Sequence, residues 1–238
     1  MENIKVRYYF SLLVKYLNKY SVRKIGESDL EFVYRIINMT PKEENTPKEE
    51  NTPKEENTSK GKQSKIHLFK KTDLQTLPRV KEIIGIVRGL SIETIVDFGS
   101  QRGALLFPLL DQFPNINFKG VDLDQDVFEM LSSINSEQFE MIKSDITKRI
   151  NEIDDKSMDL VIISEVLEHL ENPYLALCEA SRISKKYLII TVPSKPDDNP
   201  EHIQFFKIDD MVNLIKKSGF NSVNVHSNRT YNLYFATF

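Results

Sequence analysis

The chain of 238 residues is poor in cysteine, in long apolar runs and in excess positive charge. Its one cysteine, Cys178, excludes an intramolecular disulfide framework and a zinc site of several thiolates, and it suits a reducing compartment. No stretch approaches the roughly 20 apolar residues that span a bilayer, and residues 8–14 lack the cleavage site of a signal peptide. The net charge of −3 favours neither DNA nor an anionic membrane as a partner. We therefore expect a soluble, cytoplasmic protein; its oligomeric state is not indicated.

A low-complexity repeat interrupts the chain. Residues 40–58 read Thr-Pro-Lys-Glu-Glu-Asn three times and then Thr58. Each repeat begins like a helix, with Thr, Pro and Glu in capping positions, and the proline of the next repeat stops it. Without apolar side chains the segment cannot offset the entropy of ordering. We predict an extended linker over residues 40–65 that separates an N-terminal segment, 1–39, from a domain at 66–238.

The N-terminal segment has a net charge of +3 and two helical patterns. Apolar and aromatic residues recur at helical spacing over residues 6–20, and Ser28 with Glu31 forms a capping box before a second apolar stripe. These helices could form an arm over an acceptor. Packing against the main domain with a solvated charged face is the favoured interpretation.

Helical and strand patterns alternate after the linker. The strand patterns are apolar without alternation, which is typical of a parallel sheet covered on both faces. Predicted helices cover residues 77–90, 104–113, 126–134, 148–153, 173–183 and 209–218, and predicted strands cover 94–98, 118–122, 139–143, 160–163, 187–192, 222–225 and 233–237. The last two strands have a short connection and must form an antiparallel hairpin. The pattern predicts a doubly wound α/β domain.

Three successive strands end on a carboxylate. Asp97 precedes a glycine-bearing turn, Gly99 to Gly103, while Asp122 follows 25 residues later and Asp145 ends the third strand. The carboxyl ends of parallel strands meet at one edge of the sheet, where ligands of such folds bind. A carboxylate after the second strand can accept both ribose hydroxyls. Asp145 could instead cap a turn with the residues that follow it.

These motifs resemble those of class I S-adenosylmethionine (SAM)-dependent methyltransferases over about residues 75–238. The resemblance rests on residues 96–103, 120–123, 144–146 and 158–170, followed by Pro173, residues 182–184, 191–193 and 218–220, and His202. It implies a Rossmann-like, seven-stranded, mostly parallel sheet with helices on both faces and an antiparallel C-terminal hairpin. It implies SAM binding by Asp97, Gly99, Ser100, Gly103, Asp122, Leu123, Asp145, Ile146 and Ser164. Gln101 departs from the family, which usually has glycine there, so its side chain must point away from the ligand or touch it.

A second group of residues follows the fourth strand. Glu165, Glu168 and His169 have the spacing of one helical face, and His202 follows the fifth strand at the same edge. Two carboxylates and two imidazoles suit Mg²⁺ or Mn²⁺, or Zn²⁺ if the imidazoles dominate. The arrangement is similar to that of metal-assisted O-methyltransferases, including small-RNA 2′-O-methyltransferases and ubiquinone-pathway enzymes. In methyltransferases that need no metal, the histidine of this motif is a pocket residue or a base. His169 and Glu165 are therefore also candidates for catalytic residues.

The resemblance implies methyl transfer to an oxygen or nitrogen of a small molecule or an RNA. One alternative is an NAD(P)-dependent oxidoreductase, because Gly99, Gly103 and Asp122 also fit a dinucleotide. The terminal hairpin and the lack of a Tyr-x-x-x-Lys pair disfavour that function. Another alternative is a SAM-binding partner subunit without catalysis, which the acidic and imidazole groups at the strand ends disfavour.

Overall fold

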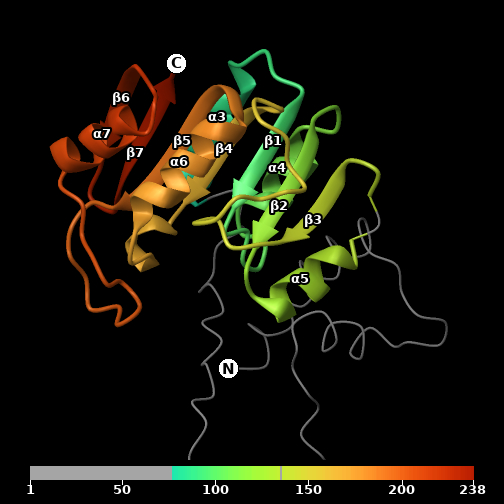
Figure 1. Cartoon of the computed structure of the whole chain (residues 1–238), viewed down its shortest axis with the longest axis horizontal. Coiled ribbons are helices and arrows are strands. Elements are labelled where there is room, and N and C mark those ends of the chain that lie inside the picture. Colours follow the sequence, from blue (N-terminus) through green and yellow to red (C-terminus); the bar gives the residue numbers. More distant parts are fainter. Residues whose placement is uncertain (1–76, 135) are drawn as a thin grey trace, which may run out of the picture.

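The structure is a computed structural model that describes residues 77–134 and 136–238 (Figure 1). The helical segment predicted at 1–39 and the linker at 40–65 lie outside the described residues. So does the beginning of the predicted domain, up to residue 76. No helix of the described part is long and apolar enough to cross a membrane.

The described residues alternate between helices and strands as the pattern predicts. The helices are α3 (Pro78–Arg88), α4 (Leu106–Gln112), α5 (Gln125–Ser132), a 3₁₀ helix at Leu167–His169, α6 (Pro173–Ile183) and α7 (Ile208–Lys217). The strands are β1 (Thr94–Phe98), β2 (Asn117–Asp122), β3 (Phe139–Lys143), β4 (Met158–Ser164), β5 (Ser184–Pro193), β6 (Ser222–Ser227) and β7 (Tyr231–Thr237). Pro108 lies in the first turn of α4, where a helix does not need the missing N–H, so it does not interrupt the helix.

The strands form one seven-stranded sheet in the order β3-β2-β1-β4-β5-β7-β6. Neighbouring strands from β3 to β5 are parallel, and β7 is antiparallel to both β5 and β6. The chain reverses its winding direction between β1 and β4. Such a switch point is where open α/β sheets bind ligands. The predicted Rossmann-like topology with a terminal hairpin is confirmed.

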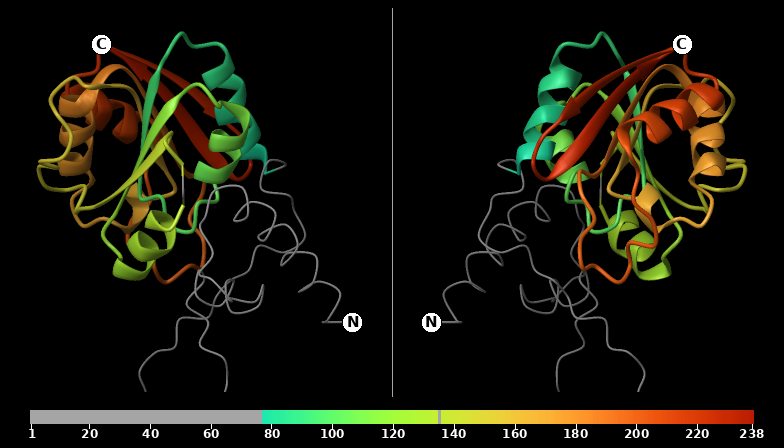
Figure 2. Two further views of the ribbon diagram at one scale, coloured as in Figure 1. Left: turned by 90° about the vertical axis from the view of Figure 1, so that its right-hand side faces the viewer. Right: turned by 90° about the vertical axis from the view of Figure 1, so that its left-hand side faces the viewer.

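Two apolar cores cover the two faces of the sheet. Figure 2 shows the helices on either side of it. Helices α3, α4 and α5 pack on one face, where Ile83, Leu109 and Leu131 are buried against the strands. Helices α6 and α7 pack on the other face and bury Leu177 and Ile215. Strand β4 is buried along nearly its whole length because it lies in the middle of the sheet between both layers. This burial explains its unbroken apolar sequence.

The prediction of a short helix at residues 148–153 is wrong. This segment forms turns, and side chains of α6 satisfy its backbone groups. Ile150 N donates to Glu179 Oε1 at 2.7 Å, and Arg182 donates to the carbonyl oxygens of Ile150 and Ile153. Because these tertiary hydrogen bonds replace helical ones, the segment crosses to β4 without a helix.

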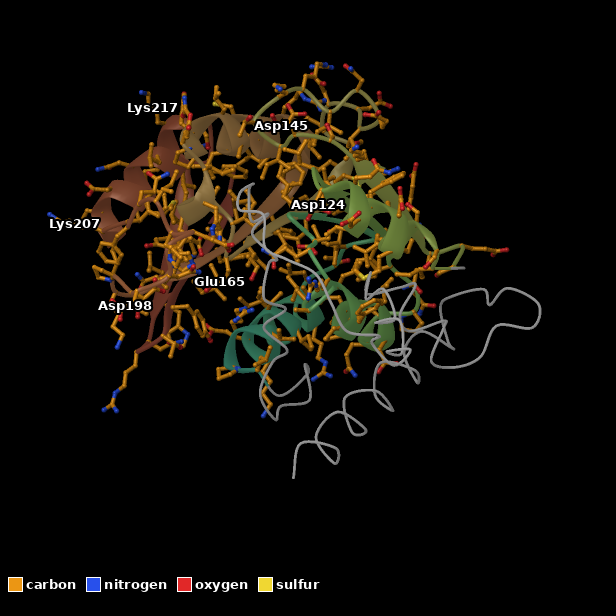
Figure 3. All side chains as sticks on the ribbon, turned by 90° about the horizontal axis from the view of Figure 1, so that it is seen from below. Asp124, Asp145, Glu165, Asp198, Lys207 and Lys217 are labelled. Carbon is orange, nitrogen blue, oxygen red and sulfur yellow. The ribbon has the colours of Figure 1, made fainter. Side chains whose placement is uncertain are left out.

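The carboxyl ends of the parallel strands lie along the lower edge of the sheet in Figure 1. Figure 3 looks onto this edge, across which Asp124, Asp145 and Glu165 are spread, with Asp198 at one end. The loop between β5 and α7 extends beside it (Figure 1). The predicted site residues belong to strand ends, to loops and to the 3₁₀ helix at this edge.

Candidate functional site

The turn after β1 has an unusual backbone. Gly99, Gln101 and Gly103 have positive φ angles of 73°, 43° and 75°. A Cβ atom on Gly99 would lie 2.5 Å from Val166 Cγ2, and one on Gly103 would lie 2.5 Å from the Phe107 ring. Both glycines are therefore needed for packing inside the protein as well as for the left-handed backbone.

Gln101, the departure from the family pattern, keeps the backbone that a glycine would adopt. Its side chain is exposed, and its N–H donates to Asp122 Oδ2 at 2.8 Å. Asp124 N donates to the other oxygen, Asp122 Oδ1, at 3.0 Å. The carboxylate of Asp122 thus has a fixed orientation, and each of its oxygens retains a lone pair for a further donor.

Asp97 and Ser100 are buried beneath this turn. Asp97 is 3% exposed, and the Ser100 hydroxyl donates to the Asp97 carbonyl oxygen at 3.0 Å. Burial raises the pKa of Asp97 to about 7, and the negative charge of Asp122 adds to this rise. Near neutral pH the Asp97 carboxyl is therefore divided between its neutral and charged forms.

The remaining residues predicted to bind SAM occupy neighbouring strand ends. Asp145 Oδ1 accepts from both the N–H and the hydroxyl of Thr147, at 2.9 and 2.6 Å, so Asp145 caps a turn. These hydrogen bonds lower the pKa of Asp145. Ile146 is buried and Leu123 is 63% exposed, while the Ser164 hydroxyl lies 2.9 Å from the Thr191 hydroxyl. The structure therefore brings the predicted residues to one edge. One oxygen of Asp145, however, is already engaged by hydrogen bonds within its own turn.

The turn after β4 contains carboxylate oxygens without partners. Glu165 has a positive φ of 56°, an uncommon conformation for a non-glycine residue, and it precedes the 3₁₀ helix. Glu165 Oε1 and both carboxylate oxygens of Glu168 are buried and find no hydrogen-bond partner among the residues that the structure describes. Burial raises the pKa of Glu168 to about 8, and the charge of Glu165 adds to the rise, whereas Arg79 opposes it. Buried carboxylates left this way are costly unless a donor or cation meets them.

Three of the four predicted metal ligands lie together. One ligand atom from each of Glu168, His169 and His202 lies within 4.8 Å of the others. The two imidazole rings meet edge to face, with centroids 4.8 Å apart. Glu165 is not part of this three-residue group, although its charge acts on Glu168.

Both histidines are oriented by a hydrogen bond at Nδ1. His169 Nδ1 lies 2.8 Å from the carbonyl oxygen of Glu201, and His202 Nδ1 lies 2.8 Å from Asp197 Oδ1. A carbonyl oxygen only accepts, so the hydrogen of a neutral His169 sits on Nδ1 and its Nε2 has the free lone pair. Metal-binding histidines are held in this way by outer partners.

The loop after β5 is tied to the 3₁₀ helix. The backbone N–H groups of Ile203 and Gln204 donate to the Glu168 carbonyl oxygen at 3.0 and 3.3 Å, and the Gln204 amide donates to Leu170 O. Sequence patterns did not point to Asp197, Gln204 or Arg79 as parts of this site. The carboxylate of Asp197, five residues before His202, was the one available signal, because acidic residues often orient ligand histidines.

The chain was compared with known proteins. Residues 96–190 match the family model described as a methyltransferase domain. None of the curated proteins matches the chain by sequence.

Solved structures share the fold. The CMeT domain of the citrinin polyketide synthase has a TM-score of 0.58 and 10% identity, with 66% of this chain and 52% of that chain covered. A SAM-dependent methyltransferase from Archaeoglobus fulgidus has a TM-score of 0.53 and 17% identity, with 67% of this chain and 94% of that chain covered. A possible histamine N-methyltransferase from Thermotoga maritima has a TM-score of 0.53 and 18% identity, with 66% of this chain and 88% of that chain covered.

The chain therefore spans about half of the first of these proteins and most of the other two. At such identities the likeness shows the fold alone. The family model covers the strands that carry the cofactor motifs, and the topology has the terminal hairpin expected for the family. Residues 96–190 thus match a methyltransferase domain, within a Rossmann-like fold that SAM-dependent methyltransferases of known structure share.

Proposed function

We propose that the protein transfers a methyl group from SAM to a hydroxyl oxygen of its acceptor, assisted by Mg²⁺ or Mn²⁺. Glu168, His169 and His202 would hold the cation, and Glu165 would supply a fourth ligand. The observation that carries this proposal is the pair of buried Glu168 oxygens, unpaired among the described residues, beside two imidazoles. A small molecule and an RNA are both retained as acceptors.

The alternative role of His169 as a general base uses the same Nε2 atom, so the two roles exclude each other. A base needs one imidazole, and it gives no reason for a second imidazole and two unpaired carboxylates around it. Like charges on Glu165 and Glu168 repel, and a divalent cation would offset that repulsion. Carboxylate ligands suit Mn²⁺ and Mg²⁺, whereas the two imidazoles would also suit Zn²⁺.

The other half of the edge fits SAM. Asp122 retains lone pairs that can accept the ribose hydroxyls. Leu123 leaves an apolar side chain exposed beside it, against which the adenine could pack, and Asp145 with Ile146 lies next along the edge. The partly charged Asp97 and the turn Gly99–Gly103, with Ser100, would face the methionine end, and Ser164 the sulfonium side.

Methyl transfer breaks the bond between the methyl carbon and the sulfonium sulfur while a bond to the acceptor oxygen forms. The electron pair stays on sulfur, and the hydroxyl proton is lost to water. The protein's part is to place the oxygen in line with the methyl group at contact distance. A bound divalent cation would lower the pKa of a hydroxyl in contact with it.

Two measurements test this function. Calorimetry with S-adenosylhomocysteine and with NAD should give binding only for the former; binding of NAD alone would contradict the proposal and favour the oxidoreductase. A tritium-labelled methyl transfer assay on cell extract, separated into RNA, protein and small molecules, should yield a labelled acceptor. We expect EDTA to abolish this labelling and Mn²⁺ or Mg²⁺ to restore it. If EDTA leaves the labelling unchanged, metal assistance is contradicted, and His169 would instead act as the general base.

A further inference from the structure

A cavity of about 170 Å³ lies beside the candidate metal ligands. Glu168 and His202 form part of its wall, and the segment from Pro193 to Phe206 supplies the rest. None of the residues predicted to bind SAM lines it. The cavity is therefore on the acceptor side of the candidate metal ligands.

The size of the cavity limits what it can hold. A cavity of about 150 Å³ holds one benzene ring, so this cavity has room for a single ring. Apolar groups form much of its wall, and two of them are left uncovered: Ile203 is 56% exposed and Phe205 is 42% exposed. Exposed apolar side chains beside a polar site are typical of surfaces that a ligand covers.

One basic side chain lines the cavity. Lys195 is exposed, and within the part of the chain that the structure describes it makes no ion pair. The nearby carboxylate of Asp197 is instead paired with His202. The Lys195 ammonium group is thus available to an anion bound in the cavity.

We propose that this cavity is the acceptor site and that the acceptor is a single hydroxylated ring with one anionic substituent. Its hydroxyl would face Glu168 and His202, its ring would lie against Phe205 and Ile203, and its carboxylate or phosphate would meet Lys195. An aromatic hydroxy acid and a ribose phosphate share this chemistry. The inference rests on the proposed function for the direction of the hydroxyl.

The test is calorimetry on the full-length chain with two pairs of probes. Each pair has an anionic and a neutral member: protocatechuate with catechol, and ribose 5-phosphate with ribose. We expect one anionic probe to bind, and the pair to which it belongs identifies the ring. Lys195→Gln should lower the affinity for the anionic probe about 10-fold, because a hydrogen bond between charged groups is lost. The affinity for the neutral member of the pair should change less than about twofold.

Phe205→Ala should weaken both members of the pair, because the ring loses its apolar contact. Lys207→Gln, a lysine near the cavity that does not line it, is the matched control and should change nothing. The proposal is overturned if neither anionic probe binds, or if Lys195→Gln weakens charged and neutral probes alike. S-adenosylhomocysteine and Mn²⁺ are titrated separately, so a failure of the proposed function is seen independently of the effect of Lys195.

Discussion

The two halves of the carboxyl edge differ in how their carboxylates are satisfied. In the half formed by β1, β2 and β3, both oxygens of Asp122 accept backbone N–H groups, and Asp145 accepts from Thr147. In the half formed by β4 and β5, two buried oxygens of Glu168 and one of Glu165 have no partner within the described ranges 77–134 and 136–238. The first half is held by its own hydrogen bonds, whereas the second half leaves buried carboxylate oxygens that a donor or a cation could meet.

The largest effect should come from removing the charge in the unsatisfied half. We expect Glu168→Gln to weaken Mn²⁺ binding by at least about 100-fold and methyl transfer by a similar factor, because a buried ligand carboxylate is lost. Binding of S-adenosylhomocysteine should stay within about twofold of the wild type if the halves are independent. Calorimetry measures both ligands.

Glu171→Gln is the control for Glu168→Gln, because it removes an exposed carboxylate three residues away. It should leave both affinities unchanged. Equal Mn²⁺ affinity in the wild type and Glu168→Gln would contradict the assignment of Glu168 as a ligand.

Asp97 is the exception within the satisfied half, and pH should reveal it. Its pKa is about 7 when folded against a usual 3.8, so between these values the folded protein keeps a proton that the unfolded chain releases. Stability should therefore fall as pH rises from about 4 to 7 and level off above, by at most about 4 kcal/mol. Urea unfolding at pH 5 and 8 should show a smaller pH dependence for Asp97→Asn; an equal dependence would contradict the raised pKa.

The outer partners of the histidines should matter less than the ligands. Asp197→Asn retains the shape of the side chain but removes the charge that orients His202, so we expect Mn²⁺ affinity to fall about 10-fold to 100-fold. Asp198→Asn, at the neighbouring exposed carboxylate, should have no effect. Manganese binding followed by electron paramagnetic resonance distinguishes the two variants, and equal affinities would remove Asp197 from the site.

The smallest effect should come from Gln101. Gln101→Gly relieves a left-handed backbone but adds freedom to the unfolded chain, and each effect amounts to about 1 kcal/mol. The free energy of unfolding should therefore change by less than about 1 kcal/mol, with the affinity for S-adenosylhomocysteine preserved. Gln101→Val should destabilise the protein, because a β-branched residue disfavours positive φ. Weaker cofactor binding by Gln101→Gly would show that the glutamine side chain touches the ligand.

Local sequence signals predicted most of the architecture. Apolar runs identified the buried strands, and the short connection before β7 required a hairpin. The helix predicted at 148–153 does not form, because Glu179 and Arg182 make hydrogen bonds to backbone groups that a helix would have paired. Both residues are distant from this segment in the sequence. Propensity describes a segment alone and cannot detect such partners.

By itself, the sequence determined the succession of strands along the chain, the edge at which the acidic residues collect and the residue types available for a cation. Only the tertiary structure decided which of them meet. It joined His202 to Glu168 and His169 across more than thirty residues by tying the loop after β5 to the 3₁₀ helix, and it left the Glu168 oxygens unpaired while engaging those of Asp122 and Asp145. The physical reason is that hydrogen-bond satisfaction depends on neighbours brought together by folding, which the spacing of residues along the chain does not contain.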